Sequence, residues 1–408
     1  EASLHIAHKQ LFPFMKDYNN AIALSKTTNK LYKDEKFKIL ESKIKNSKRP
    51  VLIFGAGAIE DYLQVREFIK KYNIPAATTL HGLGVVDETD PLALKMLGMH
   101  GSYQANMAIQ NADLIIGMGN RFDDRTIGKL TKFAPKVRKN QGLVHIDNSY
   151  EQILKVDKFT SQDLSIHCST KEILSYLNTQ EVDYINMKDR LEWLNQINIW
   201  KNNFTLNSKR NELTSNYIIS TLSNILKDKE DYILTTGVGS HQMVTAQYFD
   251  HKYPNRLLTS GSLGTMGVGL PFAIGAQIAS PNSTVILIDG DGSFTMSMNE
   301  IATIIEYNLP IKIFVMNDKK LQMVDYWQEL LYDDNKVGSK FKYTPEFDKV
   351  AESFNIMNNR VTCKLEVESI IESAINSHGA TLVNFIIDKS YCLPFVPPET
   401  ALDKMICK

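Results

Sequence analysis

The feature that most constrains the fold is a strand–turn–helix–strand unit over residues 285–318. Val285–Ile288 is a short apolar run rich in β-branched residues, which predicts a buried strand. A glycine turn follows, and then apolar residues at helical spacing that stop before Pro310. Ile311–Met316 predicts a second buried strand. Because a helix joins the two strands in a right-handed crossover, we expect them to be parallel, with both carboxyl ends at the edge where such sheets bind ligands.

Carboxylates follow both of these strands. Asp291 lies in the glycine turn after the first, and Asp318 follows the second, so we expect the two side chains to converge. Two oxygen ligands beside a glycine turn and a helix N-terminus suit a hard cation that itself holds a diphosphate. The alternative is a solvated turn, which fits most isolated Gly-Asp-Gly triplets. The spacing from this triplet to Asn317-Asp318 resembles the thiamine-diphosphate motif and favours the cation site.

The chain of 408 residues is too long for a single hydrophobic core, so we predict two domains. Strands alternate with helical segments, which predicts an α/β fold with two doubly wound parallel sheets. We place a central α/β domain at 46–175 and a C-terminal α/β domain at 213–408. Residues 1–45 are interpreted as a leading segment, and 176–212 as a connecting helix. The helical spacing of Trp193, Ile197, Trp200 and Phe204 indicates packing against a domain.

Composition excludes several functional classes. The 46 basic and 46 acidic residues give a formal net charge of zero, which favours neither nucleic acid nor an anionic membrane as a partner. The four cysteines are scattered without a CxxC pair, so we expect neither a disulfide framework nor a zinc site. No apolar stretch approaches the roughly 20 residues that a membrane-spanning helix needs.

In the central domain, several predicted strands end in polar residues or glycine. Gly55-Ala56-Gly57 follows a buried strand, but it is only half of a dinucleotide fingerprint, because Glu60 stands where a third glycine would fall. A tight turn without a ligand fits these residues at least as well. Arg121 and Arg125 can contact phosphates, and Asp147 can contact a ribose hydroxyl. The alternative is that both arginines pair with the neighbouring aspartates, and the residues alone leave both readings open.

Two further glycine-rich segments belong to the C-terminal domain. Residues 236–243 form a glycine turn that opens a helix, after the strand predicted at Tyr232–Thr235. Residues 257–279 are also rich in glycine, which lets the backbone approach a ligand closely and supplies amides for an anion. A flexible loop is the alternative, but Pro271 and the flanking apolar residues predict an ordered, packed turn.

Taken together, these segments resemble the catalytic subunits of the acetolactate synthase family of thiamine-diphosphate enzymes. The resemblance runs from about Pro50 to about Pro398, and residues 135–142 resemble the fungal members more than the bacterial ones. It is carried by LGMHG (97–101), GNRFDDRTIGKL (119–130), TTGVGSHQM (235–243), LGTMGVGLPFAIGAQ (263–277), DGDGSF (289–294), and QMV (322–324) with Trp327.

The resemblance implies a transferase of branched-chain amino-acid synthesis that condenses pyruvate with a second pyruvate or with 2-oxobutanoate and releases CO₂. It also implies a homodimer or higher oligomer, a regulatory subunit, and a mitochondrial location. Other flavin-bearing members of the family, such as pyruvate oxidase or glyoxylate carboligase, are the alternative enzymes, and Trp327 with the RFDDR run favours the synthase. A non-catalytic relic that keeps the fold is the alternative outside enzymes.

The resemblance also assigns site residues. The side chains of Asp291 and Asp318 and the carbonyl of Lys320 would hold Mg²⁺ on thiamine diphosphate. Residues implied at that cofactor are Val238, Ser240, His241, Gly264, Gly290, Gly292, Ser293 and, as the apolar wedge that bends it, Met266. Trp327, Met323 and Val324 would lie at the substrate mouth, with ordinary core packing as the alternative for Trp327. A bound FAD without a net redox role would contact Gly55, Gly57, Thr79, Leu80, Gly98, His100, Gly119, Arg121, Asp123, Arg125 and Asp147.

Several positions depart from the family pattern. The family's N-terminal domain carries the glutamate that protonates the cofactor's aminopyrimidine, and no such domain precedes residue 45, so we expect a fragment, a defective product or a chain that relies on a partner. Asp318 replaces the usual Asn, Gln322 a Gly, and Ser240 a Gln. Cys168-Ser169 replaces a Gly-Asp pair near the adenine end of the flavin. We expect these changes to affect activity more than the fold.

Overall fold

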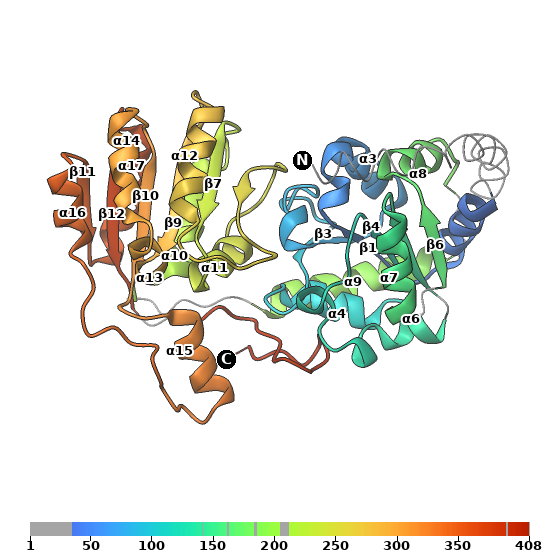
Figure 1. Cartoon of the computed structure of the whole chain (residues 1–408). Helices are drawn as coiled ribbons and strands as arrows, with labels where there is room; N and C mark the ends of the chain where they lie inside the picture. The colour runs from blue at the N-terminus through green and yellow to red at the C-terminus, as the bar shows by residue number, and fades with distance from the viewer. Residues whose placement is uncertain are drawn as a thin grey trace, which may run out of the picture.

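The computed structural model describes residues 35–140, 142–160, 163–182, 186–204, 212–388 and 391–407. The leading segment through residue 34 lies outside these residues. Two α/β bodies lie side by side, each built on a six-stranded parallel sheet between helices (Figure 1). The predicted α/β class with two doubly wound sheets is confirmed. No helix in the described part of the chain is long and apolar enough to cross a membrane.

The first sheet has the strand order β3-β2-β1-β4-β5-β6. Its strands are β1 Pro50–Phe54, β2 Ala76–Thr78, β3 Ala93–Met96, β4 Leu114–Met118, β5 Leu143–Asp147 and β6 Leu164–His167. The order reverses between β1 and β4, which pair in parallel from Pro50↔Leu114 to Phe54↔Met118. A ligand crevice is expected outside the carboxyl ends of the strands at such a reversal. β2 has only three residues, and the turn after it forms a short 3₁₀ helix, η3 Leu80–Gly82.

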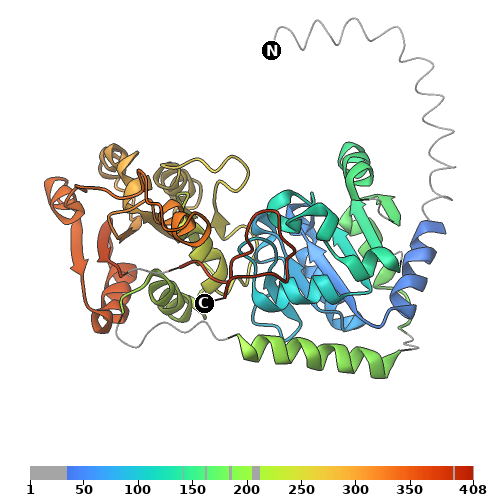
Figure 2. The same ribbon diagram turned by 90° about the horizontal axis from the view of Figure 1, so that it is seen from below.

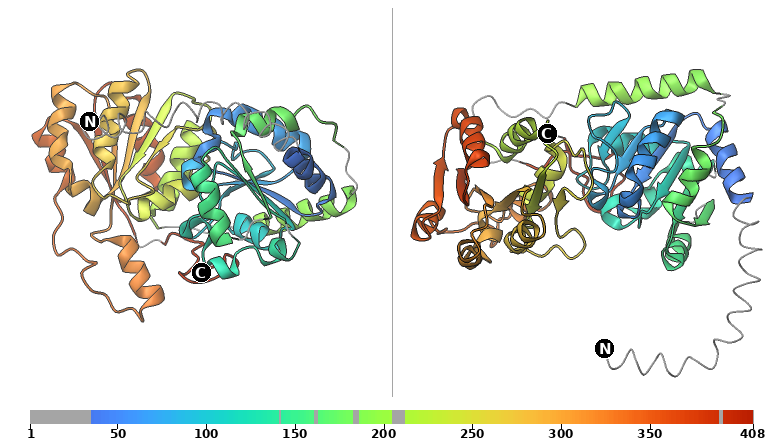
Figure 3. Two further views of the ribbon diagram at one scale, coloured as in Figure 1. Left: turned by 45° about the vertical axis from the view of Figure 1, so that its right-hand side comes forward. Right: turned by 90° about the horizontal axis from the view of Figure 1, so that it is seen from above.

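Helices cover both faces of this sheet. One face packs against the helix at 35–46, α3 Tyr62–Tyr72 and α8 Thr170–Leu177. The other packs against α4 Tyr103–Asn111, α6 Pro135–Lys139 and α9 Met187–Asn203. Figure 3 shows α9 lying along the outside of the first body. The packing predicted for its tryptophans is confirmed, since Trp193 is buried, stacks edge-on against Trp200 at 5.7 Å and donates from Nε1 to the Pro50 carbonyl.

The second sheet has the order β11-β12-β10-β9-β7-β8. Its strands are β7 Tyr232–Thr236, β8 Leu257–Leu258, β9 Thr284–Gly290, β10 Lys312–Asn317, β11 Met357–Val361 and β12 Thr381–Ile386. The predicted crossover unit is present: β9 leads into α13 Asp291–Thr295 and α14 Ile301–Glu306, and β10 pairs with β9 in parallel. Alternate residues of β9 and β10 face opposite sides. One side packs against α10 Ser215–Leu226, α11 Ser240–Tyr248 and α17 Val367–Asn376, and the other against α12 Gly269–Ala279 and α16 Phe347–Ser353.

Polar contacts tie the two bodies together along one seam. The His251 amide donates to Glu88 Oε2 at 3.0 Å, and the Glu88 amide donates to the His251 carbonyl. Lys95 forms an ion pair with Asp250 at 2.7 Å. Burial raises the pKa of Glu88 to about 7, against the opposing effect of the Lys95 charge. The seam therefore contains a carboxyl group that titrates near neutral pH.

A C-terminal strap, residues 391–407, forms a second connection. Figure 2 shows it in dark red, running from the second body onto the first. The Val396 amide donates to the Met99 carbonyl at 2.8 Å, and the Lys129 amide donates to the Thr400 carbonyl at 3.1 Å. Leu402 is fully buried in the core of the first body. The strap thus completes the core of a domain that lies far from it in the sequence.

Candidate active site

A cavity of about 800 Å³ lies between the two bodies, at the carboxyl ends of the strands of the first sheet. Its walls come from the segments after β1, β2, β4 and β5, and from residues 260–264 and Trp327 of the second body. The predicted flavin residues that line it are Gly57, Thr79, Leu80, His100, Gly119, Arg121, Asp123, Arg125 and Asp147. We call this the first cavity.

Gly55 and Gly98, the other two predicted flavin residues, lie behind the wall. A Cβ atom on Gly55 would be 2.1 Å from the Gly119 carbonyl oxygen, so this glycine lets the turn after β1 lie against the turn after β4. Gly98 has φ of +108°, and its amide donates to Asn106 Oδ1 at 2.8 Å. Both glycines therefore position the backbone around the cavity and do not line it.

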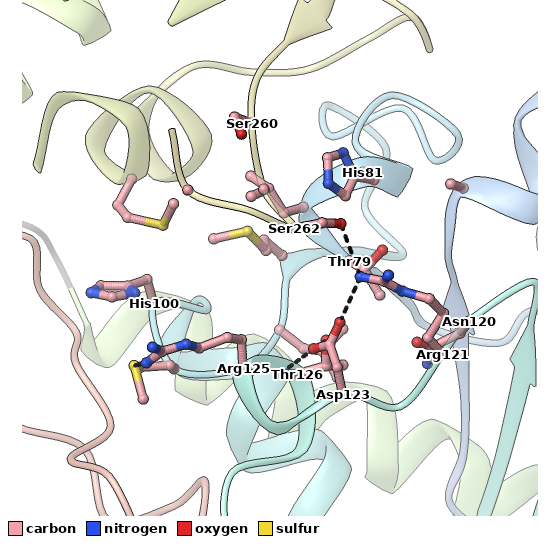
Figure 4. A pocket seen from close by; sticks show the side chains of 18 of the residues that line it. Thr79, His81, His100, Asn120, Arg121, Asp123, Arg125, Thr126, Ser260 and Ser262 are labelled. Carbon is pink, nitrogen blue, oxygen red and sulfur yellow. Dashed lines mark hydrogen bonds and ion pairs between the residues drawn. The ribbon is translucent and has the colours of Figure 1, made fainter. Parts of the chain in front are cut away.

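Arg121 and Arg125, the two arginines of the RFDDR run, lie beside carboxylates and also line the first cavity. Arg121 Nη2 lies 3.1 Å from Asp123 Oδ2 and donates to Ser262 Oγ at 3.3 Å (Figure 4). Arg125 lies 4.0 Å from Asp124 and stands over the Trp327 ring at 6.0 Å. Both guanidinium groups are more than half exposed and line the first cavity. They can therefore meet an anion there while keeping their carboxylate neighbours.

A second cavity of about 220 Å³ lies at the carboxyl ends of β9 and β10. All of the residues predicted for thiamine diphosphate and its metal line it: Val238, Ser240, His241, Gly264, Met266, Gly290, Asp291, Gly292, Ser293, Asp318 and Lys320. Met323 and Val324, predicted at the substrate mouth, line it as well. Val238, Gly264 and Met323 also line the first cavity, so the two cavities share a wall.

The carboxylates of Asp291 and Asp318 converge as the sequence predicts. Burial raises the pKa of Asp291 to about 7, and the neighbouring charge of Asp318 adds to this effect. Burial also raises the pKa of Asp318 to about 6, against the opposing Lys320 charge. The Oδ2 atom of each is buried and has no hydrogen-bond partner among the described residues. Because unpaired buried carboxylates are costly, this oxygen donor set fits a hard divalent cation such as Mg²⁺.

The described residues contain no group of three or more His, Cys, Asp or Glu side chains that can hold a metal. With two carboxylates and a backbone carbonyl, the chain offers only part of the six oxygen ligands that Mg²⁺ takes. The other ligands must come from another molecule or from water. This incomplete set is what a metal that bridges to a diphosphate requires.

His241 reaches the second cavity from the N-terminus of α11. Its Nε2 atom lies 3.1 Å from Asp289 Oδ1, and both side chains are buried. The ring lies between two glycines: a Cβ atom on Gly290 would be 2.8 Å from Nδ1, and one on Gly239 would be 2.9 Å from Cε1. The sequence predicted these glycines as parts of the turns after β7 and β9. The structure shows that they also make room for the imidazole.

The prediction that the glycine-rich residues 257–279 form a packed turn is only partly correct. Gly269 is buried, and a Cβ atom there would be 2.5 Å from the Gly237 amide nitrogen. Residues 261–265 are exposed, however, and Leu263 is 90% exposed. Small and polar residues leave this stretch without apolar side chains to bury, apart from Leu263 itself.

The residues that depart from the family pattern lie in different parts of the structure. Cys168 is buried in the first core, and Ser169 caps α8 by accepting from the Glu172 amide at 3.2 Å; neither lines the first cavity. Gln322 lines the second cavity, as its sequence position suggested. Residues of the first cavity that the sequence did not single out include His81, Gln152, Gln242, Ser260 and Ser262. Gln152 lies in the helix after β5 and had no signal in the sequence, and the others lie in or beside glycine-rich turns.

Two family profiles match this chain, one in each of the two bodies. The profile "Thiamine pyrophosphate enzyme, central domain" matches residues 39–177, and "Thiamine pyrophosphate enzyme, C-terminal TPP binding domain" matches residues 237–385. The chain belongs to the thiamine pyrophosphate enzymes. The second matched range contains the residues of the second cavity, which ties the family assignment to the site with the unpaired carboxylates.

Relatives within this family are acetolactate synthase subunits, so the predicted resemblance is confirmed. The chain is 36% identical over 374 residues to "Acetolactate synthase catalytic subunit, mitochondrial" of Saccharomyces cerevisiae, covering 88% of this chain and 53% of the relative. It is 38% identical to "Acetolactate synthase, mitochondrial" of Schizosaccharomyces pombe, covering 89% and 56%. It is 37% identical to "Probable acetolactate synthase large subunit" of Methanococcus aeolicus, covering 89% and 62%. The chain thus spans little more than half the length of these relatives.

Proposed function

We propose that this thiamine pyrophosphate enzyme is an acetolactate synthase, a transferase that condenses pyruvate with a second pyruvate or with 2-oxobutanoate and releases CO₂. The observation that carries the proposal is the pair of buried carboxylates, Asp291 and Asp318, whose Oδ2 atoms have no partner among the described residues. They lie at the edge of the sheet where β9 and β10 end, in a family whose members bind thiamine diphosphate.

The polar residues of the second cavity would bind the metal and the diphosphate. Asp291, Asp318 and the Lys320 carbonyl would hold Mg²⁺, and the diphosphate would lie on the metal beside His241. Asp289 Oδ1 lies 3.1 Å from His241 Nε2, close enough for its carboxylate to favour a proton on that nitrogen. When bound, thiamine diphosphate supplies the electron sink for the carbon that loses CO₂.

The apolar residues shape the reaction space. Met266 and Val324 line the second cavity, and Met323 lines its shared wall with the first. They would exclude water from the reacting carbon, which strengthens every charge interaction there. Trp327 lines the first cavity under Arg125, where the size of its ring would limit the second 2-oxo acid.

For the first cavity we propose FAD, bound without a net redox role. Arg121 and Arg125 would meet its phosphates, and Asp147 would accept from a ribose hydroxyl. By analogy with the family we also propose a homodimer or higher oligomer that pairs with a regulatory subunit. A mitochondrial location is proposed on the printed names of the fungal relatives.

Two acid-to-amide variants test both cavities with one design. Isothermal calorimetry with thiamine diphosphate and Mg²⁺ should give saturable heat in the unaltered chain and in Asp147→Asn, but not in Asp291→Asn. Flavin binding, measured by fluorescence quenching of FAD, should weaken in Asp147→Asn and persist in Asp291→Asn. Asp291→Asn removes a proposed metal–carboxylate contact and Asp147→Asn a proposed carboxylate–hydroxyl contact, and each loss is local because the two aspartates line different cavities.

Each variant is the control for the other. If Asp291→Asn binds thiamine diphosphate and Mg²⁺ as tightly as the unaltered chain, the carboxylate pair does not hold the metal and the central argument is wrong. Equal loss of both ligands in either variant would mean that the substitution disturbs the fold.

A further inference from the structure

A buried tyrosine joins the two bodies where the cavities share a wall. Tyr326 lies in α15 Gln322–Leu331 of the second body and is 1% exposed. Its hydroxyl oxygen lies 3.1 Å from Nε2 of His100, a residue of the first body that lines the first cavity. The same hydroxyl lies 2.7 Å from Sδ of Met323, which lines both cavities. One hydroxyl group thus contacts the walls of both.

Aromatic packing through Phe395 links the Tyr326–His100 pair to Trp327. The ring of Phe395, from the C-terminal strap, lies 5.4 Å from the His100 ring, 6.1 Å from Tyr326 and 5.4 Å from Trp327. The Gln247 side chain holds the His100 backbone by donating to its carbonyl at 2.9 Å. Gln247 lies in α11 of the second body, so the second body holds both the backbone and the ring of His100, and Tyr326 and Trp327 pack at this contact between the bodies.

Both partners are neutral over a wide pH range. Burial, aided by the Arg125 charge, lowers the pKa of His100 to about 3. Burial raises the pKa of Tyr326 well above its usual range. The hydroxyl has a single proton, so when Tyr326 donates to Met323 Sδ, His100 donates to the tyrosine oxygen from Nε2. A neutral hydrogen bond in this buried setting restrains α15 at any pH at which the protein works.

We propose that Tyr326 is a positioning residue, whose hydrogen bond to His100 holds Met323 and Trp327 at the shared wall of the two cavities. This inference rests on the proposed function, in which Met323 and Trp327 border the space for the second 2-oxo acid. Tyr326 itself does not line either cavity, so it acts through its neighbours.

Tryptophan fluorescence tests this inference without any ligand. The chain has three tryptophans, so replacing Trp193 and Trp200 by Phe leaves Trp327 as the single reporter. In that background, Tyr326→Phe keeps the ring and removes only the hydroxyl. We expect a red-shifted Trp327 emission and stronger quenching by acrylamide. Loss of a hydrogen bond of about 1–2 kcal/mol should also speed hydrogen exchange of the α15 amides by about 5- to 30-fold.

Two further variants make the result specific. His100→Phe should produce the same change in Trp327, and the double variant should add nothing more, because both substitutions remove the same contact. Tyr72→Phe is the matched control: its buried hydroxyl donates to the Leu177 carbonyl at 2.8 Å within the first body, so Trp327 should not respond.

Unchanged Trp327 emission in Tyr326→Phe, or additive effects in the double variant, would overturn the inference. If Tyr326→Phe does not fold, as judged by circular dichroism, the His100→Phe variant provides the same test from the other side of the bond. Since the assay contains no cofactor, its outcome is independent of whether the chain binds thiamine diphosphate.

Discussion

The titration of Glu88 at the seam between the two bodies gives the sharpest test of the structure. Burial raises its pKa from the ordinary value of 4.5 to about 7, and Oε1 has no hydrogen-bond partner among the described residues. Between these two pH values the folded protein keeps a proton that the unfolded chain loses. The contribution of Glu88 to the free energy of unfolding is therefore full below pH 4.5 and is lost as the pH rises to about 7.

The magnitude follows from the two pKa values. One pKa unit corresponds to about 1.4 kcal/mol, so the change from 4.5 to about 7 amounts to about 3 kcal/mol. Glu88→Gln carries an amide that cannot ionise and so does not lose this contribution. We expect the variant to be more stable than the unaltered protein by less than about 1 kcal/mol at pH 5 and by up to about 3 kcal/mol at pH 8.

Other charged groups around Glu88 must not obscure the result. Lys95, Asp250 and Asp87 contribute to its pKa, and His251 contacts it directly. Burial lowers the pKa of His251 from 6.5 to about 4. Between these pH values the unfolded chain binds the extra proton, so the free energy of unfolding rises with pH, whereas the Glu88 contribution falls. Because His251 is present in both proteins, its contribution cancels in the difference between them.

The assay is urea unfolding of both proteins at several pH values between 5 and 8.5. The exposed Glu372→Gln is the control, and its stability difference should not vary with pH by more than about 0.5 kcal/mol. A difference between Glu88→Gln and the unaltered protein that stays constant across this range would refute the reasoning. The seam would then keep Glu88 ionised in the folded state.

Two further substitutions test how the glycine turns and the strap support the site. Gly237→Ala would place a Cβ atom 2.1 Å from Asp289 Oδ1 and 2.2 Å from Ser293 Oγ, so calorimetry should show loss of thiamine diphosphate binding, and unchanged binding would mean that these side chains can move away. Leu402→Ala should lower the free energy of unfolding in urea by about 2–5 kcal/mol, because Leu402 is fully buried in the first core. The control Leu263→Ala, at a 90% exposed position, should stay within about 0.5 kcal/mol, and similar losses in both would show that the strap does not complete the core.

The sequence predicted the second cavity better than the first for a physical reason. The two aspartates proposed for the metal directly follow β9 and β10, two neighbouring parallel strands joined by one crossover. Strand identity and the handedness of that crossover therefore suffice to bring Asp291 and Asp318 together. Both strands are continuous apolar runs in the sequence because both of their faces are buried, and in the structure alternate residues pack against the two helical layers.

The first cavity could be predicted only in part because two bodies build it. Its own sheet supplies Arg121 and Asp147, which the strand ends indicated. The opposite wall comes from Ser260, Ser262 and Trp327, and no local pattern says how the second body docks against the first. The polar contacts of the seam could not be predicted for the same reason. Nothing local marks Glu88, and its partner His251 lies 163 residues away in the sequence.

The glycines show where a correct pattern had an incomplete explanation. Gly290 was expected at the cofactor, and Gly239 was expected only as part of a glycine turn; both line the second cavity. Yet each would also collide with the His241 ring if it carried a Cβ atom, and Asp289 Oδ1 lies 3.1 Å from the Nε2 atom of that ring. The turn after β9 therefore does two things at once. It places Asp291 in the second cavity, where we propose the metal, and it leaves the space in which a buried imidazole stands beside the position proposed for the diphosphate.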